Sequence, residues 1–220
     1  MTSENQTDHY TLSEKFARDF YLERKAVLSR AFDDIDKLNI NEEDKERVRY
    51  IIANNLTDAF YAILTGLDGC ICIGESQQQT YKIYTESDAL ISYCGELEVE
   101  VYEYFHANKY EAENSDADFI ATLSYKTTEE GGRKTYAKSG YRPQIKFNFD
   151  DMCTSGQQTF IEREIVFPGD TVNAEIILLS AEYFEGKLRV GMKFEFMEGK
   201  TIIGTGEIIR IVNNKLNNNN

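Results

Sequence analysis

Glu129–Phe149, which reads EEGGRKTYAKSGYRPQIKFNF, joins a glycine-rich loop to a β-strand pattern. Its Gly and Pro residues are turn formers, and Pro143 is one of only two prolines in the chain. The QIKFNF run alternates apolar and polar residues, as a strand with one buried face does. The stretch therefore predicts a loop that leads into a strand. Its Gly131-Gly132-Arg133 run could cradle a phosphate, make a tight turn or shape a docking surface.

The sequence on both sides of this stretch is nearly all of β type. Further strand patterns, separated by turn signals, are FIATLSY (119–125), FIEREIVF (160–167), TVNAEIILLS (171–180), LRVGMKFEFM (188–197) and TIIGTGEIIRIV (201–212). Together with QIKFNF they predict a closed barrel or a sandwich over residues 119–213. The Asn-rich end, residues 214–220, is predicted to be a disordered tail because it is polar and of low complexity.

Residues 11–106 predict an α+β domain. Apolar residues recur at helical spacing from Leu12 to Leu38 and again from Val48 to Ile63, with Asn41 as the N-cap of the second helix. GLDG (66–69) ends that helix. The runs CICIG (70–74), TYKIYTE (80–86), ALISY (89–93) and ELEVEVYEYF (96–105) predict a small antiparallel sheet after the helical hairpin. Residues 1–10 are expected to be a flexible N-terminus, and the polar residues 107–118 a linker.

Charge is divided unevenly along the chain. The 220 residues carry 24 Lys and Arg against 38 Asp and Glu, a net charge of −14. Residues 1–118 hold 11 basic and 25 acidic side chains, a net of −14, whereas residues 119–220 hold 13 of each. A field of this sign repels a phosphate backbone, so nucleic-acid binding is not expected of the chain as a whole.

One positive segment stands out against this acidic background. Fourteen residues without an acid contain five cations, Arg133, Lys134, Lys138, Arg142 and Lys146, interleaved with Tyr136 and Tyr141. The segment could bind a phosphate or an acidic protein surface. Alternatively, Tyr141 and Arg142 shape the barrel mouth while the lysines are merely solvated.

Compartment signals favour a cytoplasmic protein. The four cysteines, Cys70, Cys72, Cys94 and Cys153, are too few and too scattered for a disulfide framework. The N-terminal sequence MTSENQTDHYTLSEK lacks the apolar stretch of a signal peptide, and no apolar run approaches the roughly 20 residues of a membrane helix. We therefore expect reduced thiols and no membrane partner.

No recognisable catalytic constellation is found, and we expect a protein that is not an enzyme and uses no cofactor and no metal. The GxxxxGK[S/T] loop of nucleotide triphosphatases is absent. Gly204-Thr205-Gly206 begins like a dinucleotide fingerprint, but Ile209 replaces the third glycine and the run lies inside a strand pattern. The two glycines are better explained by a bulge or a close backbone approach.

An alternative hypothesis places an active site in the N-terminal half. It would use the thiols of Cys70, Cys72 and Cys94 and the carboxylates of Glu96, Glu98 and Glu100, which would share one face of a strand. A zinc site would combine Cys70 and Cys72 with two more ligands, Cys94 and His106, although neither of these two lies in a recognised ligand spacing. His9 and His106 are the only histidines available as general bases.

Four motifs in the second half occur together in a specific order. They are EEGGRKT, GYRPQIKFNF, FPGDTVNAEIILL and GKLRVGMKFEFMEGKTIIGTGEI. In this order they resemble the C-terminal (third) β-barrel domain of the elongation factor Tu family, which reads EGGRHT, GYRPQFYF, a PGD turn before a long strand, and FAIREGGRTVGAG. The resemblance covers about residues 119–213. The N-terminal half resembles no family that we can name.

The resemblance implies a six-stranded antiparallel barrel with a docking face. In the family, the Gly-Gly-Arg and Tyr-Arg-Pro-Gln loops meet the GTPase domain, and the same face contributes to the contact with aminoacyl-tRNA. Gly140 and Pro143 also match the family's motifs. The motif residues and the cations of the positive segment together give the predicted docking residues: Gly131, Gly132, Arg133, Lys134, Lys138, Tyr141, Arg142 and Gln144.

This chain departs from the family's pattern at several points, which limits the functions that the resemblance implies for it. Tyr136-Ala137-Lys138 replaces an aromatic stretch, and Lys200 stands where the closing motif has Arg. The family's GTPase domain and second barrel have no counterpart here, so GTP hydrolysis is not expected. The sequence therefore favours a binding module that contacts a translation factor, a GTPase or tRNA, or that docks its own N-terminal domain on the barrel face. An immunity or regulatory protein that mimics the elongation factor is one form of this hypothesis.

Overall fold

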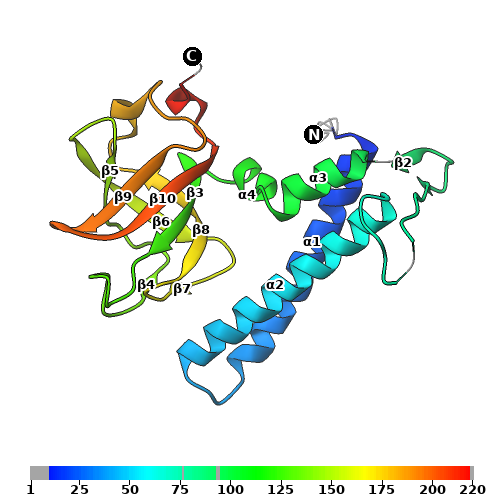
Figure 1. The fold of residues 1–220 in the computed structure, drawn as a ribbon, viewed down its shortest axis with the longest axis horizontal. Coiled ribbons are helices and arrows are strands. Elements are labelled where there is room, and N and C mark those ends of the chain that lie inside the picture. The colour runs from blue at the N-terminus through cyan, green and yellow to red at the C-terminus, as the bar shows by residue number, and fades with distance from the viewer. Residues whose placement is uncertain (1–9, 76, 93–94, 219–220) are drawn as a thin grey trace, which may run out of the picture. The chain divides into compact units, whose positions relative to one another are not determined.

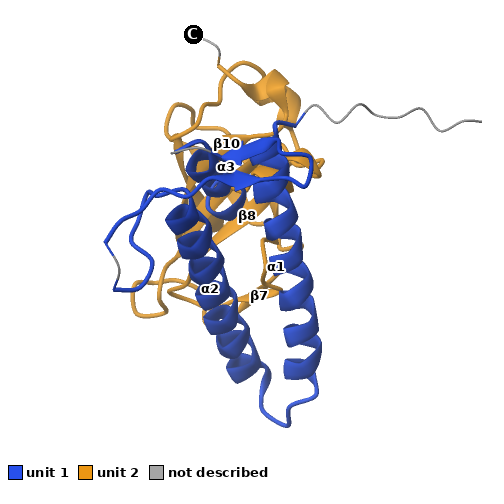
Figure 2. Cartoon of the chain, turned by 90° about the vertical axis from the view of Figure 1, so that its right-hand side faces the viewer, with its two compact units in different colours: residues 1–107 blue, residues 108–220 orange. Residues whose placement is uncertain are grey.

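The computed structural model describes residues 10–75, 77–92 and 95–218, and the expected flexible N-terminus at 1–10 lies outside them except for Tyr10. The chain forms two compact units, Met1–Ala107 and Asn108–Asn220 (Figure 2).

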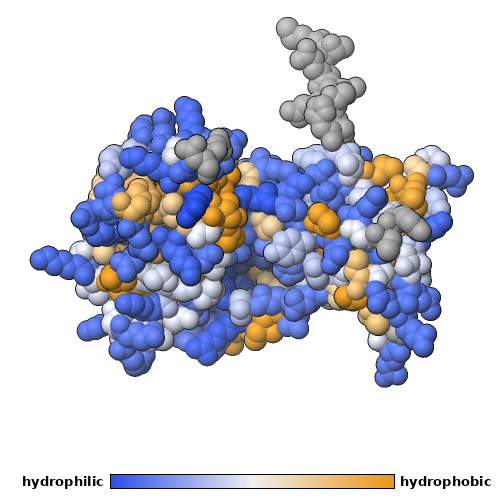
Figure 3. All heavy atoms as spheres, turned by 45° about the horizontal axis from the view of Figure 1, so that its top comes forward, coloured by the Kyte–Doolittle hydropathy of each residue, from blue (hydrophilic) through white to orange (hydrophobic). Residues whose placement is uncertain are grey.

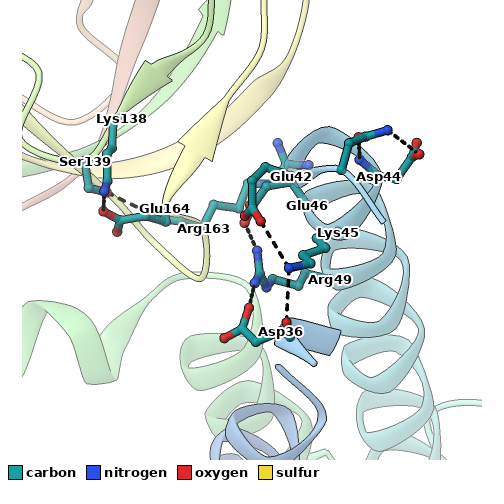
Figure 4. Close-up of polar contacts among 11 residues, drawn as sticks. Asp36, Glu42, Asp44, Lys45, Glu46, Arg49, Lys138, Ser139, Arg163 and Glu164 are labelled. Atoms are coloured by element: carbon teal, nitrogen blue, oxygen red, sulfur yellow. Dashed lines mark hydrogen bonds and ion pairs between the residues drawn. The ribbon is translucent and has the colours of Figure 1, made fainter. Parts of the chain in front are cut away.

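Two long antiparallel helices dominate the first unit, α1 (Leu12–Asp36) and α2 (Glu42–Leu67), which lie side by side in Figures 1 and 2. The predicted helical hairpin and its cap are confirmed. Asn41 Oδ1 accepts a hydrogen bond from the Asp44 N–H at 2.8 Å, because the first N–H groups of a helix need an acceptor from outside the ladder. At the turn between the helices, Arg49 pairs with both Glu46 and Asp36 (Figure 4).

The sheet of this unit is smaller than predicted. It has two short antiparallel strands, β1 (Ile83–Tyr84) and β2 (Leu90–Ser92), and residues 70–74 form no strand. The strand prediction for 96–105 is wrong, because this run is helix α3 (Glu96–Phe105). Its alternating pattern also fits a helix, since Leu97, Val101, Tyr104 and Phe105 recur at helical spacing and all four are buried.

A buried carboxylate stabilises the start of α3. The N-cap residue, Gly95, has no side chain that could accept a hydrogen bond. Asp68, at the end of α2, takes this role: its Oδ2 accepts from the Glu98 N–H at 2.9 Å, and its Oδ1 accepts from the Ser92 hydroxyl. A carboxylate at a helix N-terminus also interacts favourably with the helix dipole. The helical form of 96–105 therefore rests on this cap together with the burial of the apolar residues at helical spacing.

The second unit begins with a short helix, α4 (Lys109–Glu113), inside the region predicted as a linker. A closed six-stranded antiparallel barrel follows, with the strand order β10-β3-β8-β6-β5-β9 (Figure 1). Its strands are β3 (Phe119–Tyr125), β5 (Gln144–Phe147), β6 (Cys153–Phe160), β8 (Thr171–Leu178), β9 (Lys193–Glu198) and β10 (Thr201–Ile211). The remaining elements are the strand pair β4 (Ala137–Lys138) and β7 (Ile165–Val166) and the 3-10 helices η1 (Ala181–Phe184) and η2 (Asn214–Leu216). The predicted six-stranded barrel is confirmed.

One barrel strand was assigned to the wrong residues. The run 160–167 contributes the last residue of β6, Phe160, and the short strand β7. The barrel strand is β6, which mostly precedes the run and has Thr154, Gly156, Gln158 and Phe160 at its inward positions. Three of these four are not apolar, so no hydrophobic alternation signals the strand. The barrel requires the small residue: a Cβ on Gly156 would lie 2.2 Å from Ile145 Cδ1.

The prediction of a disordered tail is wrong for residues 214–216. η2 carries Leu216 into the barrel core, where it is fully buried in the same cluster as Phe184 and Leu188. Backbone hydrogen bonds fix it: the Leu188 N–H donates to Leu216 O at 2.9 Å, and the Gly186 N–H donates to Lys215 O at 2.9 Å. One apolar residue in a polar run suffices to anchor the segment.

The glycine pair of β10 combines both explanations that the sequence left open. The register with β9 shifts between Ile202 and Gly204, and neighbouring atoms approach both glycines closely. Cβ atoms on Gly204 and Gly206 would lie 2.1 and 2.2 Å from ring atoms of Phe196 and Phe194. These positions point into the barrel, where aromatic rings occupy the space.

Candidate functional site

The loop that follows β3 is held as a tight turn. Gly131 adopts φ +84°, a conformation that L side chains rarely adopt, and its N–H donates to Thr128 O at 3.1 Å. The Gly132 N–H donates to Thr127 O at 2.8 Å, and a Cβ on Gly132 would lie 2.2 Å from Lys126 O. Both backbone N–H groups are thus used inside the loop. The arrangement favours the tight-turn role over a phosphate cradle.

Arg133 and Tyr141 connect this loop to the β9–β10 hairpin. The Arg133 guanidinium lies 4.5 Å from the Tyr141 ring centroid and forms an ion pair with Glu198. The Tyr141 hydroxyl donates to the same carboxylate at 2.5 Å. Burial raises the pKa of Tyr141 despite the opposing effect of Arg133, so the phenol remains a neutral donor. Sequence reasoning missed Glu198 because it lies 57 residues beyond Tyr141.

Most of the other cations in the positive segment also have partners. Lys138 pairs with Glu164 at 3.5 Å (Figure 4), and Lys146 pairs with Asp151 at 2.9 Å. Lys134 is exposed, and no partner for it occurs in the described part of the chain. Acids from elsewhere in the chain therefore neutralise much of a segment that contains none itself, which weakens its attraction for phosphate.

Arg142 and Gln144 belong to a different surface, the outer face of β5, β6 and β8. The Arg142 guanidinium donates to Gln157 Oε1 at 2.9 Å, and Gln157 is paired with Ile177 across the strands. Gln144 is paired with Ser155, and the Leu179 N–H donates to Ser155 O at 2.8 Å. We call these six residues the β5–β6–β8 face: Arg142, Gln144, Ser155, Gln157, Ile177 and Leu179.

Two large apolar side chains of this face are exposed to solvent. Leu179 is 78% exposed and Ile177 is 44% exposed. Ile177 is an outward position of β8, and Leu179 directly follows the strand two residues later. The ionisable residues Lys146, Cys153 and Glu175 occupy neighbouring outward positions of β5, β6 and β8. Adjacent exposed apolar residues with polar surroundings are typical of a protein-interaction site. Figure 3 shows that apolar groups reach the molecular surface between polar ones on the side in view.

The residues proposed for an N-terminal active site do not form the expected row. Glu96, Glu98 and Glu100 lie on a helix, where residues two apart point in different directions. Cys70 Sγ lies 3.9 Å from Asp68 Oδ2, and Cys94 is outside the described residues. Among described residues, no group of three or more His, Cys, Asp or Glu is arranged to hold a metal ion.

His106 follows α3 and packs edge-on against Tyr61, with ring centroids 4.5 Å apart. Burial lowers the pKa of His106, and the charge of Arg24 adds to this effect while Asp58 opposes it. His9 lies outside the described residues.

Comparison with known protein families found no family model that matches this chain. Within the described residues, no helix combines the length and the apolar character that crossing a membrane requires.

Proposed function

We propose that this chain is a non-enzymatic binding protein whose barrel docks onto a protein component of the translation machinery. The observation that carries the proposal is the β5–β6–β8 face. Its exposed Ile177 is the strand partner of Gln157, which Arg142 contacts, and the N–H of the exposed Leu179 bonds to Ser155, the strand partner of Gln144. Arg142 and Gln144 belong to the Tyr-Arg-Pro-Gln motif. Protein interfaces commonly combine an apolar centre with polar groups and an arginine.

Charge supports a protein partner over tRNA. Arg133, Lys138 and Lys146 pair with carboxylates, which leaves few cations for a phosphate backbone. Arg142 differs, because its guanidinium donates to the neutral amide of Gln157. Its charge is therefore not neutralised by that contact and would suit a carboxylate on the partner protein.

The motif resemblance to the elongation factor Tu barrel is the reason that we expect a partner from the translation machinery. The matched loops correspond to the part of the elongation factor Tu barrel that meets a GTPase domain. A translation factor with a GTPase domain is accordingly the partner class that we favour. A regulator or mimic of the elongation factor would use the same face.

Affinity capture of the tagged full-length chain from the lysate of its source organism tests this proposal. Translation factors and ribosomal proteins are quantified by mass spectrometry, and tRNA by gel electrophoresis. We expect translation proteins to be enriched on the unmodified chain and to fall about tenfold on the Ile177→Ser/Leu179→Ser variant, because apolar anchors dominate interface energies.

Val190→Ser is the matched control, since Val190 is an exposed apolar residue of the barrel unit outside this face. It should leave the capture unchanged. Equal recovery on the double variant and the unmodified chain, or no translation protein on either, contradicts the proposal. Recovery of tRNA that depends on Arg133 and Lys134 would replace the protein partner with a nucleic-acid partner.

A further inference from the structure

Helix α3 has apolar residues on two faces, and only one of them is buried. Its core face consists of Leu97, Val101, Tyr104 and Phe105. On the opposite side, Val99 is 60% exposed and Tyr102 is 52% exposed. Because residues three apart lie on the same side of a helix, these two side chains form one outward-facing apolar pair. The alternation that resembles a strand pattern therefore supplies more apolar residues than the core of this unit uses.

The exposed pair continues into a row of aromatic rings. The centroid of Tyr102 lies 5.8 Å from that of His106, one turn later. His106 in turn lies 4.5 Å from Tyr61 of α2, with the rings edge to face. These contacts all lie within the first unit. We call Tyr61, Val99, Tyr102 and His106 the α3 aromatic face.

Carboxylates surround this face. Glu96 precedes Val99 by three residues and is exposed. Glu98 is close enough to Tyr61 to contribute, after burial, to the raised pKa of its phenol, and Asp58 interacts electrostatically with His106. α3 itself contains four glutamates and no basic residue. The unit as a whole, residues 1–107, carries 10 basic and 21 acidic side chains, a net of −11.

We propose that the α3 aromatic face binds a cationic segment of a partner protein, with Lys or Arg side chains over the tyrosine rings and an apolar side chain on Val99. Aromatic ring faces attract cations, and carboxylates nearby strengthen the attraction. The acids disfavour nucleic acid. The ten-residue helix offers a face about 15 Å long, which suits a peptide segment better than a small ammonium ion. The proposal is independent of the barrel function.

Fluorescence anisotropy with the full-length chain tests the proposal. The probe is a labelled 18-residue Leu/Lys peptide with helical periodicity, and the counterpart in which every Lys is Glu serves as the charge-reversed peptide. We expect the Lys peptide to bind and the Glu peptide not to bind. Affinity for the Lys peptide should fall at least about fivefold between 50 and 300 mM NaCl, because salt screens exposed charges.

Two variants separate the contributions of the face. Val99→Gln/Tyr102→Gln should weaken binding about tenfold and leave the salt dependence in place. Glu96→Gln/Glu98→Gln should weaken binding and flatten the salt dependence. The control Asp19→Asn/Asp33→Asn removes the same charge from exposed positions of α1 and should have little effect. Circular dichroism at 222 nm verifies that each variant is folded.

Three results would overturn the assignment. The first is no binding of the Lys peptide at 100 µM. The second is binding that the folded Val99→Gln/Tyr102→Gln variant retains in full. The third is an equal loss with the Asp19/Asp33 control, which would assign the binding to the net charge of the unit instead of to this face.

Discussion

The C-terminal segment should stabilise the barrel strongly, although its composition is that of a flexible tail. Leu216 is fully buried with Phe184 and Leu188. Leu216→Ala removes about three CH₂ equivalents from the core, which corresponds to about 2.4 kcal/mol at roughly 0.8 kcal/mol each. A residual cavity would add to this loss, but a segment near the chain end can shift to fill it. We therefore expect the free energy of unfolding to fall by about 2 to 3 kcal/mol.

Urea denaturation measures this loss. The chain contains 14 tyrosines and no tryptophan, so tyrosine fluorescence reports the unfolding, while circular dichroism at 222 nm follows the helices of the first unit. With a slope of about 1.5 kcal/mol per M, the midpoint of the barrel transition should move down by about 1.3 to 2 M. The helical transition should stay in place if the two units unfold independently.

Asn214→Ala is the matched control, because Asn214 belongs to the same 3-10 helix and is exposed. It should change the stability by less than about 0.5 kcal/mol. If Leu216→Ala and Asn214→Ala have the same small effect, burial of Leu216 does not stabilise the barrel, and the expected loss of about 2 to 3 kcal/mol is refuted. Deletion of residues 214–220 should cost at least as much as Leu216→Ala, since it also removes the backbone bonds to Gly186 and Leu188.

Three further predictions concern the loop and the first unit. Asp68→Ala should lower the helical signal at 222 nm and destabilise the first unit by about 1 to 3 kcal/mol. The reason is that the buried Ser92 hydroxyl and the Glu98 N–H lose their acceptor. An unchanged urea midpoint would contradict the capping role. Gly132→Ala should destabilise the barrel by more than about 1 kcal/mol, because the Cβ of the new alanine would meet backbone atoms of Lys126 and Thr127. A loss of stability below about 0.5 kcal/mol in thermal denaturation would show that the loop adjusts freely. The pKa of His106 is lowered in the fold, so the imidazole of the unfolded chain binds a proton more tightly than that of the folded chain. The folded state therefore loses stability as the pH falls below about 6.5. His106→Gln should flatten this part of the pH–stability curve, and parallel curves for the two proteins would exclude the effect.

Local patterns were sufficient for the strongly periodic elements. The hairpin of α1 and α2 follows from apolar spacing and the Asn41 cap, and β3 and β8 follow from β-rich runs that alternate over most of their length and are bounded by turns. These predictions succeed because a helix stripe or an alternating strand displays its buried face directly in the order of residues. The glycines of β10 were also interpretable, because a strand that excludes Cβ atoms implies a close neighbour.

Where contacts between distant residues decided the outcome, the same patterns failed. Asp68 caps α3 from outside the helix, and the core buries the residues of 96–105 that recur at helical spacing, although the run also alternates like a strand. β6 was missed because inward positions in a filled barrel accept Gly156 and Gln158 in place of large apolar residues. In both cases the deciding partner is far away in sequence, and local propensity is weaker than packing and hydrogen bonding.

The candidate site likewise combines features that the sequence predicted with features that only the fold revealed. The sequence by itself determined the β character of the second half, five of its six barrel strands, the motif residues in its loops and the acidic character of the first half. Only the tertiary structure decided that Glu198, Glu164 and Asp151 neutralise much of the positive segment, and that Ile177 and Leu179 lie exposed beside Arg142 and Gln144. Strand register and loop closure set these neighbours, because charge pairing and exposure depend on distances in space and not on separation along the chain.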